Sequence, residues 1–496
     1  MPSSAQLAFA TIDLKADAMS GHDELIALSA CDAVARLRAG EVSPVELVDA
    51  AADRIAAVNP AVNAVPTLCL DQARDAAQAL QQPKNPEPGW LAGLPVVVKD
   101  LNETAGVRTT FGSPIFADNV PTRDEVMVET LKKRGAIVIG KANTPEFGSG
   151  ANTFNEVFGK TRNPWNTAMT CGGSSGGSAV SVATGMSWLA TGNDLGGSLR
   201  TPASFCSIVG LRPSVGRVAH GAGLMWQDIH QSLVAEGPLG RSVPDVALML
   251  DAQSGRHPRD PKSLEAPAVP FLNAAHEPRA PKRVGYTPNL GIGPVDPEVT
   301  EICAAAARRF TDAGSFVEES CPDFSGSMDI FQTLRAALFA SIAAPLLDNH
   351  RDQLKPEMVW QVEKGMALTA GEVGRAAIAR TKLYERVLHW FGDYDVLALP
   401  AAIVPPFDVD IRYVEQVGDY RFDNYVDWIY ITYAITLTGC PAISVPAGFT
   451  KSGLPVGIQL VGRPFGEAEL LSYAAQLENI LGLGNMTPLD PIVGVA

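Results

Sequence analysis

Short runs of consecutive apolar residues alternate along this chain with longer stretches in which apolar residues recur every three or four positions. An uninterrupted apolar run of four to eight residues is typical of a strand that is buried on both faces of a sheet. We predict such strands at residues 94–100, 136–140, 283–286, 395–400, 442–446 and 454–461.

The intervening stretches predict helices. Ser43 followed by Pro44 is a typical helix start, because a serine side chain can cap the first turn and proline fits the first helical position. Helices are predicted at residues 22–39, 44–58, 70–81, 124–134, 246–252 and 296–313, with several more within 326–393. Alternating helices and buried strands indicate an α/β fold, which we predict to be a single large mixed β-sheet covered by helices on both faces.

The chain has 496 residues, more than most single hydrophobic cores, so two or three domains would be the usual expectation. The stretch 256–282 is rich in proline, alanine and charge, and we predict it to be an exposed loop or linker. Because strands are predicted on both sides of it, we favour a single domain over residues 1–496. Residues 1–85 are expected to form an N-terminal helical layer within that domain.

Charge and composition exclude several classes of partner. The formal net charge of −15 disfavours nucleic acid, because phosphate binding needs clustered lysine and arginine. No uninterrupted apolar run reaches the roughly 18 residues that span a bilayer, and the N-terminus lacks a basic segment, so neither a membrane nor a secretory signal is expected. The seven cysteines are scattered and never spaced as C-x-x-C. We therefore predict no metal, no disulfide framework and a reduced, cytoplasmic location.

Glycine and serine are concentrated in residues 171–213, in two clusters at 172–178 and 196–198. A phosphate-binding loop is disfavoured, because no lysine follows the glycines and the spacing G-x-G-x-x-G is missing. The small apolar residues 179–190 between the clusters predict a buried helix that would hold two serine loops at a fixed separation. Catalytic hydroxyls require such a separation, although paired glycines also form purely structural turns.

A catalytic serine needs a base, because its hydroxyl is a poor nucleophile at neutral pH. None of the seven histidines lies in a strand-and-turn context typical of a Ser–His–Asp triad, and the chain has no G-x-S-x-G turn. Lys99 follows three valines at the end of a predicted buried strand. Because loss of hydration lowers the pKa of a lysine, Lys99 is our candidate base, with an ordinary surface lysine as the alternative.

Three segments resemble the amidase signature family: LAGLPVVVKD around Lys99, GGSSGGSAV, and GNDLGGSLRTPASFC. Further blocks in the family's order lie at residues 140–148, 161–166 and 439–446. The resemblance implies a Ser–Ser–Lys triad that cleaves amides, with Ser198 as nucleophile, Ser174 as bridging serine and Lys99 as base. It also implies a cis peptide bond between Gly173 and Ser174, and no cofactor.

Amide cleavage assigns roles to the neighbours of these residues. The oxyanion formed when a serine attacks a carbonyl needs amide donors, and we expect them from Leu195, Gly196, Gly197 and Ser198. Expected supports of the two loops are Ser175, Asp194 and Arg200. The family often has threonine or serine where this chain has Asn193, and threonine in place of Leu195; we expect the chemistry to survive both departures.

The substrate pocket is expected to involve the residues just before the bridging serine and the variable helices after the core. Gly148 and Gly150, which flank Ser149, leave room, and Trp226 with Phe331 offers apolar surface. We therefore predict an uncharged aryl or alkyl amide, or a carbamate, as substrate, although a tryptophan beside a glycine-rich loop often belongs to the core.

Two other functions stay open from the sequence. One is an amidotransferase subunit with the same catalytic residues, which supplies ammonia to a partner acting on charged tRNA. The other is a non-catalytic binding protein with the same fold. The presence of all three triad residues favours an enzyme whose partner is a small-molecule amide. The natural amide and the oligomeric state, for which a homodimer is one candidate, do not follow from the sequence.

Overall fold

The computed structural model describes residues 21–224 and 228–494, and its centre is one mixed sheet of 11 strands. In spatial order these are β1 (Thr67–Leu68), β3 (Ile137–Ala142), β2 (Pro95–Lys99), β8 (Leu189–Asp194), β10 (Ala235–Gly240), β9 (Val209–Arg212), β16 (Ala442–Phe449), β17 (Pro455–Val461), β13 (Val396–Pro400), β11 (Arg283–Tyr286) and β12 (Phe316–Glu319). Strands β3, β2 and β8 are parallel, as are β13, β11 and β12. The other pairs in the sheet are antiparallel.

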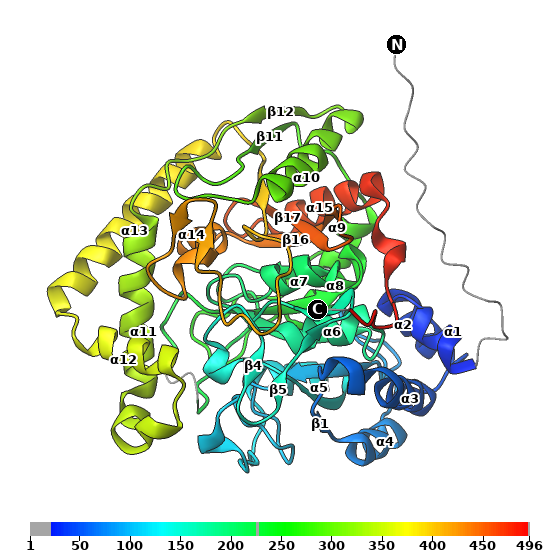
Figure 1. Ribbon diagram of the computed structural model, residues 1–496. Coiled ribbons are helices and arrows are strands. Elements are labelled where there is room, and N and C mark those ends of the chain that lie inside the picture. The colour runs from blue at the N-terminus through cyan, green and yellow to red at the C-terminus, as the bar shows by residue number, and fades with distance from the viewer. Residues whose placement is uncertain (1–20, 225–227, 495–496) are drawn as a thin grey trace.

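Helices surround this sheet, with the N-terminal ones on one side of the molecule and the long ones of the second half on the opposite side (Figure 1). They are α1 (Gly21–Ala27), α2 (Ala30–Ala39), α3 (Pro44–Val62), α4 (Leu70–Ala79), α5 (Val126–Lys133), α6 (Gly176–Ala183), α7 (Arg200–Cys206), α8 (Val243–Gln253), α9 (Phe271–His276), α10 (Pro297–Arg308), α11 (Ser327–His350), α12 (Pro356–Met366), α13 (Ala370–Trp390), α14 (Tyr430–Thr438) and α15 (Glu467–Leu481). Three small ribbons lie outside the sheet: β4 (Phe154–Asn155) with β5 (Gly159–Lys160), β6 (Arg162–Asn163) with β7 (Asn166–Thr170), and β14 (Gln416–Val417) with β15 (Tyr420–Arg421).

Both faces of the sheet are covered, as the packing of β13 shows. Successive side chains of a strand point to opposite faces. Val396 and Ala398 belong to an apolar cluster that includes residues of α8, α10 and α15. Leu397 and Leu399, which alternate with them, belong to a second cluster with residues of α11, α13 and α14. The predicted α/β fold, with a single large sheet between helices, is confirmed.

Most of the predicted elements form. The predicted buried runs correspond to β2, β3, β11, β13, β16 and β17. Ser43 caps α3 and forms a capping box with Glu46, and Asp296 caps α10. The single helix predicted over 22–39 is wrong in one respect: it is divided into α1 and α2, because the side chain of Ser29 caps a new helix by accepting a hydrogen bond from the Asp32 amide.

The helix predicted over 179–190 is also wrong in its bounds. Helix α6 ends at Ala183, and β8 begins at Leu189. The reason is Gly185, which has a left-handed φ of 75° just beyond the helix end, and glycine at that place is a common stop signal. A side chain there would also meet Ile26 at 2.5 Å. The apolar run therefore splits into a short helix and the start of a central strand.

The segment 256–282 is exposed or partly exposed for most of its length, but α9 lies within it, and its residues Phe271 and Ala275 are buried. Strands on either side of this segment, β10 and β11, lie in the same sheet. The N-terminal helices α1 to α4 pack as a group beside the β1 end of the sheet (Figure 1). A single domain remains our prediction for the whole chain.

One helical stretch, Ser327–Gln353, is long and apolar enough, by length and composition, to cross a membrane. Half of its most apolar window is buried inside the protein, and a core helix passes the same test. Phe331 and Phe339 of this helix belong to the second apolar cluster, which is the packing of a core helix.

Candidate active site

Lys99, the last residue of β2, is wholly buried at the centre of the candidate site. Its Nζ lies 2.7 Å from Ser174 Oγ and 2.9 Å from Ser175 Oγ. It also donates to Asn193 Oδ1 at 2.8 Å. The parallel neighbour β8 supplies Asn193, while the two serines precede α6. The alternative of a surface lysine is therefore excluded.

Burial changes the protonation of this amine. Loss of hydration lowers the pKa of Lys99 from 10.5 to about 7, and the charges of Glu236 and Asp194 oppose that shift. At neutral pH a large fraction of Lys99 is therefore uncharged, as a proton acceptor must be.

The two glycine-serine segments meet directly. Ser174 follows a cis peptide bond with Gly173, as the resemblance implied. The amide of Ser175 donates to the carbonyl oxygen of Ser198 at 3.3 Å, so one backbone hydrogen bond joins the two segments. Ser174 and Ser198 both line the same cavity. The fixed separation that we expected from a connecting helix comes instead from this contact and from β8.

Asp194, at the end of β8, organises the second serine segment. Its carboxylate accepts hydrogen bonds from the amides of Gly197 at 2.9 Å and Leu199 at 3.1 Å. Arg200 binds both of its oxygens, at 2.8 and 3.0 Å, and Arg212 approaches at 3.4 Å. Burial alone would raise the pKa of Asp194, but the two arginines and these hydrogen bonds hold it well below its usual range.

One predicted oxyanion donor is not available. The Gly197 amide is directed to Asp194 and cannot also point into the cavity. Among the described residues, no hydrogen bond engages the amides of Leu195, Gly196 and Ser198. Gly197 instead has a structural role, because its φ is 122° and a side chain there would meet Thr432 Oγ1 at 2.3 Å.

The cavity beside the serines is small, about 30 Å³, and has mostly apolar walls. At ~10–15 Å³ for each water molecule, it has room for about two waters. Gly148 and Gly150 line it, as predicted, whereas Ser149 lies behind the wall and bonds to Tyr425 Oη at 2.8 Å. Trp226 lies outside the described residues. The apolar side chains that line the cavity are Leu101, Phe147, Leu195, Val234, Phe331, Phe339 and Ile429.

Sequence reasoning missed Arg335 of α11, a buried residue that lines the cavity. Its Nη2 donates to Ser149 Oγ at 3.1 Å and to Tyr425 Oη at 2.9 Å, and its Nη1 donates to Gln361. The guanidinium also lies 4.5 Å from the ring centre of Phe339. Nothing in the local sequence marks this arginine, because its partners come from distant segments.

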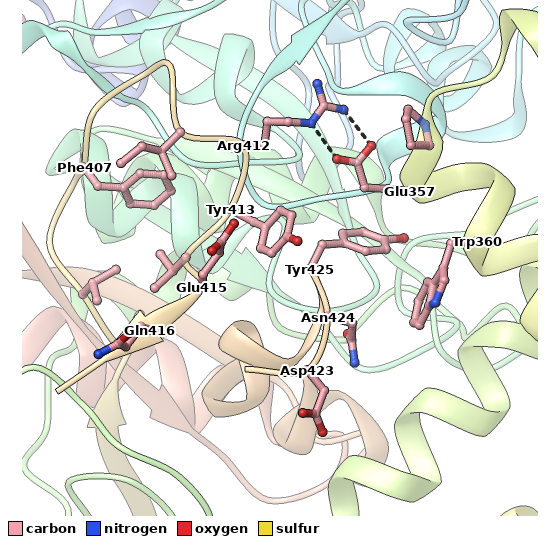
Figure 2. Close-up of a pocket in the computed structure, with 14 residues that line it drawn as sticks. Glu357, Trp360, Phe407, Arg412, Tyr413, Glu415, Gln416, Asp423, Asn424 and Tyr425 are labelled. Carbon is pink, nitrogen blue, oxygen red and sulfur yellow. Dashed lines mark hydrogen bonds and ion pairs between the residues drawn. The ribbon is translucent and has the colours of Figure 1, made fainter. Parts of the chain in front are cut away.

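A larger cleft of about 960 Å³ lies on the other side of Tyr425. Figure 2 shows Tyr413 and Tyr425 close together in this cleft, and Trp360 of α12 at its side. Arg412 forms a two-pronged ion pair with Glu357, at 2.7 and 2.8 Å. Tyr425 lines the cleft and bonds to Arg335, which lines the cavity, so one hydrogen-bonded pair joins the walls of the two spaces.

A cluster of titratable groups lies next to this site. Glu125, His220 and Glu236 are buried, with one ligand atom of each within 4.8 Å of the others. Such a set could hold a divalent metal ion, and sequence reasoning did not find it. Asn102 donates to Glu125 at 2.7 Å and to Glu236 at 3.3 Å.

A buried amine beside paired serines, on a mixed α/β sheet, is a set of groups that suits a hydrolase. Comparison with known proteins agrees: a family model described as Amidase matches residues 46–471. The chain belongs to the amidase signature family.

Two named relatives show the range of the family. The chain is 35% identical to an acylamidase of Rhodococcus erythropolis over 94% of its own length and 98% of the relative. It is 34% identical to the A-type subunit of the glutamyl-tRNA(Gln) amidotransferase of Geotalea daltonii, over 92% and 97% of the two chains.

Solved structures give the same result. A bacterial aryl acylamidase of the amidase signature family superposes with a TM-score of 0.84 at 27% identity, covering 93% of this chain and 99% of that one. The 6-aminohexanoate cyclic dimer hydrolase superposes with a TM-score of 0.83 at 28% identity, over 92% and 97% of the chains. The protein is thus an amide-hydrolysing enzyme, which removes the alternative of a non-catalytic binding protein.

Proposed function

We propose that this enzyme hydrolyses a carboxylic amide through an acyl-enzyme on Ser198, with Ser174 and Lys99 as the proton relay. The observation that carries this proposal is the contact of 2.7 Å between Lys99 Nζ and Ser174 Oγ in a fully buried setting. A pKa near 7 for Lys99 allows it to accept a proton at neutral pH.

The direction of the relay follows from the partners of the amine. A neutral amine has two N–H donors and one lone pair. The side-chain oxygen of Asn193 can only accept, and the Ser175 hydroxyl donates to the Asn193 carbonyl oxygen at 3.4 Å, which leaves its own oxygen to accept. Both N–H donors are then used, so the lone pair faces Ser174, whose hydroxyl proton moves to Lys99.

The steps balance without a cofactor. Ser174 gives its proton to Lys99 and takes one from Ser198, whose oxygen attacks the amide carbon. The relay then returns a proton to the amide nitrogen, the C–N bond breaks with its electron pair on nitrogen, and the amine leaves while the acyl group stays on Ser198 as an ester. Water repeats the attack on the ester and releases the acid. We assign the oxyanion to the amides of Leu195, Gly196 and Ser198, with Ser175, Asp194 and Arg200 as supports.

The adduct left by an aryl fluorophosphonate tests the nucleophile. Mass mapping after digestion is expected to place the phosphonyl group on Ser198, and pretreatment is expected to abolish amide hydrolysis. A label on any other residue, or full activity in the labelled enzyme, would contradict the assignment.

For the substrate we propose an uncharged aryl or alkyl amide, with carbamates as a further class. The apolar cavity walls support this proposal, and so does the similarity to an acylamidase and an aryl acylamidase. Because Arg335 adds a positive charge to the wall, the screen should pair each neutral amide with its carboxylated analogue. Faster turnover of the carboxylated members would contradict the uncharged class.

Because the cavity is too small for such a substrate, we propose that the Tyr425–Arg335 pair moves apart and joins the cavity to the cleft, whose Tyr425 is shown in Figure 2. Tyr425→Phe removes the hydroxyl shared by Ser149 and Arg335, and we expect KM to change about threefold or more while kcat stays within about twofold, since no transition-state contact is lost. The control is Tyr420→Phe, at an exposed tyrosine. Equal effects of both variants would contradict a role for this pair.

The similarity to the A-type subunits of amidotransferases keeps a second function in view. An ammonia-supplying subunit would have the same triad but would depend on a partner. Turnover of simple amides by the purified chain alone is expected under our proposal, and absence of turnover on amides and glutamine without a partner would favour the second function. We also propose a reducing, cytoplasmic setting, since all seven cysteines are free thiols.

A further inference from the structure

Two lysines at the ends of neighbouring parallel strands, Lys99 of β2 and Lys141 of β3, are both wholly buried. A buried cation is costly unless an opposite charge lies close to it. The cluster of Glu236, His220 and Glu125 is joined to both lysines through Asn102. From one lysine to the other, the charges alternate in sign: lysine, glutamate, imidazolium, glutamate, lysine.

The inner links of this series are direct contacts, and the outer ones run through Asn193 and Asn102. Asn193, which accepts from Lys99, is directly opposite Glu236 across the β8–β10 pair, so the two side chains share one face of the sheet. His220 Nδ1 lies 3.4 Å from Glu236 and 3.3 Å from Glu125. Burial disfavours the imidazolium, but the hydrogen bonds and charges of both glutamates outweigh it and raise the pKa of His220 to about 10.

Asn102 connects the two lysines. Its amide donates to the Lys99 carbonyl oxygen at 3.0 Å, and its own carbonyl oxygen accepts from Lys141 Nζ. Its side chain donates to both glutamates, at 2.7 and 3.3 Å. The carboxylates are therefore held in place beside the turn that follows Lys99.

The negative charges of two carboxylates, Glu236 and Asp194, raise the pKa of Lys99. The two carboxylates differ in how much of their charge is neutralised by neighbouring cations. Asp194 of β8 binds Arg200 and Arg212, so most of its field is cancelled locally. Glu236 of β10 accepts from the Asn102 side-chain amide and faces the imidazolium of His220, which it shares with Glu125. The serines on the α6 side carry no charge, and the Lys141 ammonium faces Asn102, Thr104 and Thr109.

We propose that Glu236 is a positioning residue for Lys99, whose buried carboxylate, held by Asn102 and shared with His220, sets how readily the amine takes and releases a proton. This inference rests on the proposed role of Lys99 as base. Burial alone would make the amine too weak a base to draw a proton from a serine; the nearby negative charge restores part of its basicity. The alternating charges account for the buried Glu–His–Glu set without a metal ion.

The test is the acid limb of the pH profile in Glu236→Gln, measured both for kcat/KM on an aryl amide and for inactivation by an aryl fluorophosphonate. Loss of the negative charge disfavours the ammonium form, so the limb is expected to move to lower pH by about one unit. The plateau is expected to fall several-fold, because a weaker base draws the proton less well. Glu236→Asp is expected to restore most of the wild-type limb.

The matched control is Glu125→Gln, which removes a carboxylate from the same cluster on the side of Lys141. It is expected to lower Tm while moving the acid limb by less than about 0.3 units, since His220 and Glu236 stay beside Lys99. An unmoved limb in a folded Glu236→Gln, or an equal shift in the control, overturns the inference. One metal ion per chain, bound by Glu125, His220 and Glu236 and retained through purification, also overturns the inference. The ion would then take the place of the positive charge that we assign to His220. A failure of the proposed function would give a different result. If Lys99 were not the base, the Lys99→Met variant would remain active.

Discussion

Lys99 and Lys141 lie at the ends of adjacent parallel strands, both are buried, and burial lowers the pKa of both, to about 7 and about 8. Their partners differ. Lys141 Nζ faces the carbonyl oxygen of Asn102 and the hydroxyls of Thr104 and Thr109. Each of these hydroxyls donates its own proton to a backbone carbonyl oxygen, at 3.3 and 3.1 Å. All three partners therefore accept, and Lys141 must supply three protons as an ammonium.

Lys99 has one partner of another kind. The Ser174 hydroxyl makes no other hydrogen bond among the described residues, so its proton is free to move to the amine. Burial thus lowers the pKa of both lysines, but only the partners of Lys99 suit the role of base that we propose. A depressed pKa by itself would not have distinguished a catalytic lysine from a structural one.

The largest effect is expected from Ser198→Ala, which tests whether the reaction takes place beside Lys99 rather than beside Lys141. Amide turnover is expected to fall by about 10⁴-fold or more, because the nucleophile is lost. The control is Ser181→Ala, whose hydroxyl bonds only to a carbonyl of its own helix. Retention of about a tenth of the activity in the first variant would contradict its role; steady-state kinetics and Tm measure both.

The variants Lys99→Met and Lys141→Met test whether the two lysines have different roles. Equal effects of the two variants on kcat and on stability would contradict this difference. We expect Lys99→Met to keep its fold and lose about 10³-fold or more in kcat, since the relay has no acceptor. We expect Lys141→Met to lose stability, because three buried acceptors lose their donor at about 1–3 kcal/mol each, while kcat of the folded enzyme stays within about tenfold. Thermal unfolding and kinetics on the same samples separate the two outcomes.

The pH dependence is expected to separate the lysines again. Under the proposed relay, activity needs neutral Lys99, so kcat/KM is expected to fall as pH drops through about 7. For Lys141, the folded pKa of about 8 lies below the ordinary lysine value of 10.5. The unfolded chain binds more protons between these values, so the cost of burying the Lys141 charge is complete below pH 8 and falls as pH rises towards 10.5. Tm of wild type minus that of Lys141→Met should therefore rise across this window, and a flat difference would contradict the assignment.

The smallest effect is expected from Thr109→Val, which removes one acceptor from Lys141 and leaves the shape of the side chain nearly unchanged. A loss of about 1 kcal/mol in unfolding free energy is expected, with no movement of the acid limb of kcat/KM. Thr381→Val, in an exposed helix position, serves as the control. A shift of the acid limb in Thr109→Val would show that the two lysines are coupled more tightly than their partners indicate.

Much of the fold and the centre of the site could be predicted from the sequence. Apolar runs marked the central strands because a strand buried on both faces cannot alternate in polarity. The valines before Lys99 placed a lysine at the end of such a strand, and the two glycine-serine segments marked the loops that bring Ser174 and Ser198 to it. Local residue type determined these features, so a local pattern was enough to predict them.

Tertiary structure alone decided the rest. The Gly197 amide is taken by Asp194, which removes one expected oxyanion donor, because two arginines fix the direction of that carboxylate. The charge pattern around Glu236 depends on which strands pair and which helix end packs beside them. Such contacts join residues that are far apart in the sequence, and no local pattern records them. The sequence by itself determined which groups could react, and the packing determined their protonation and direction.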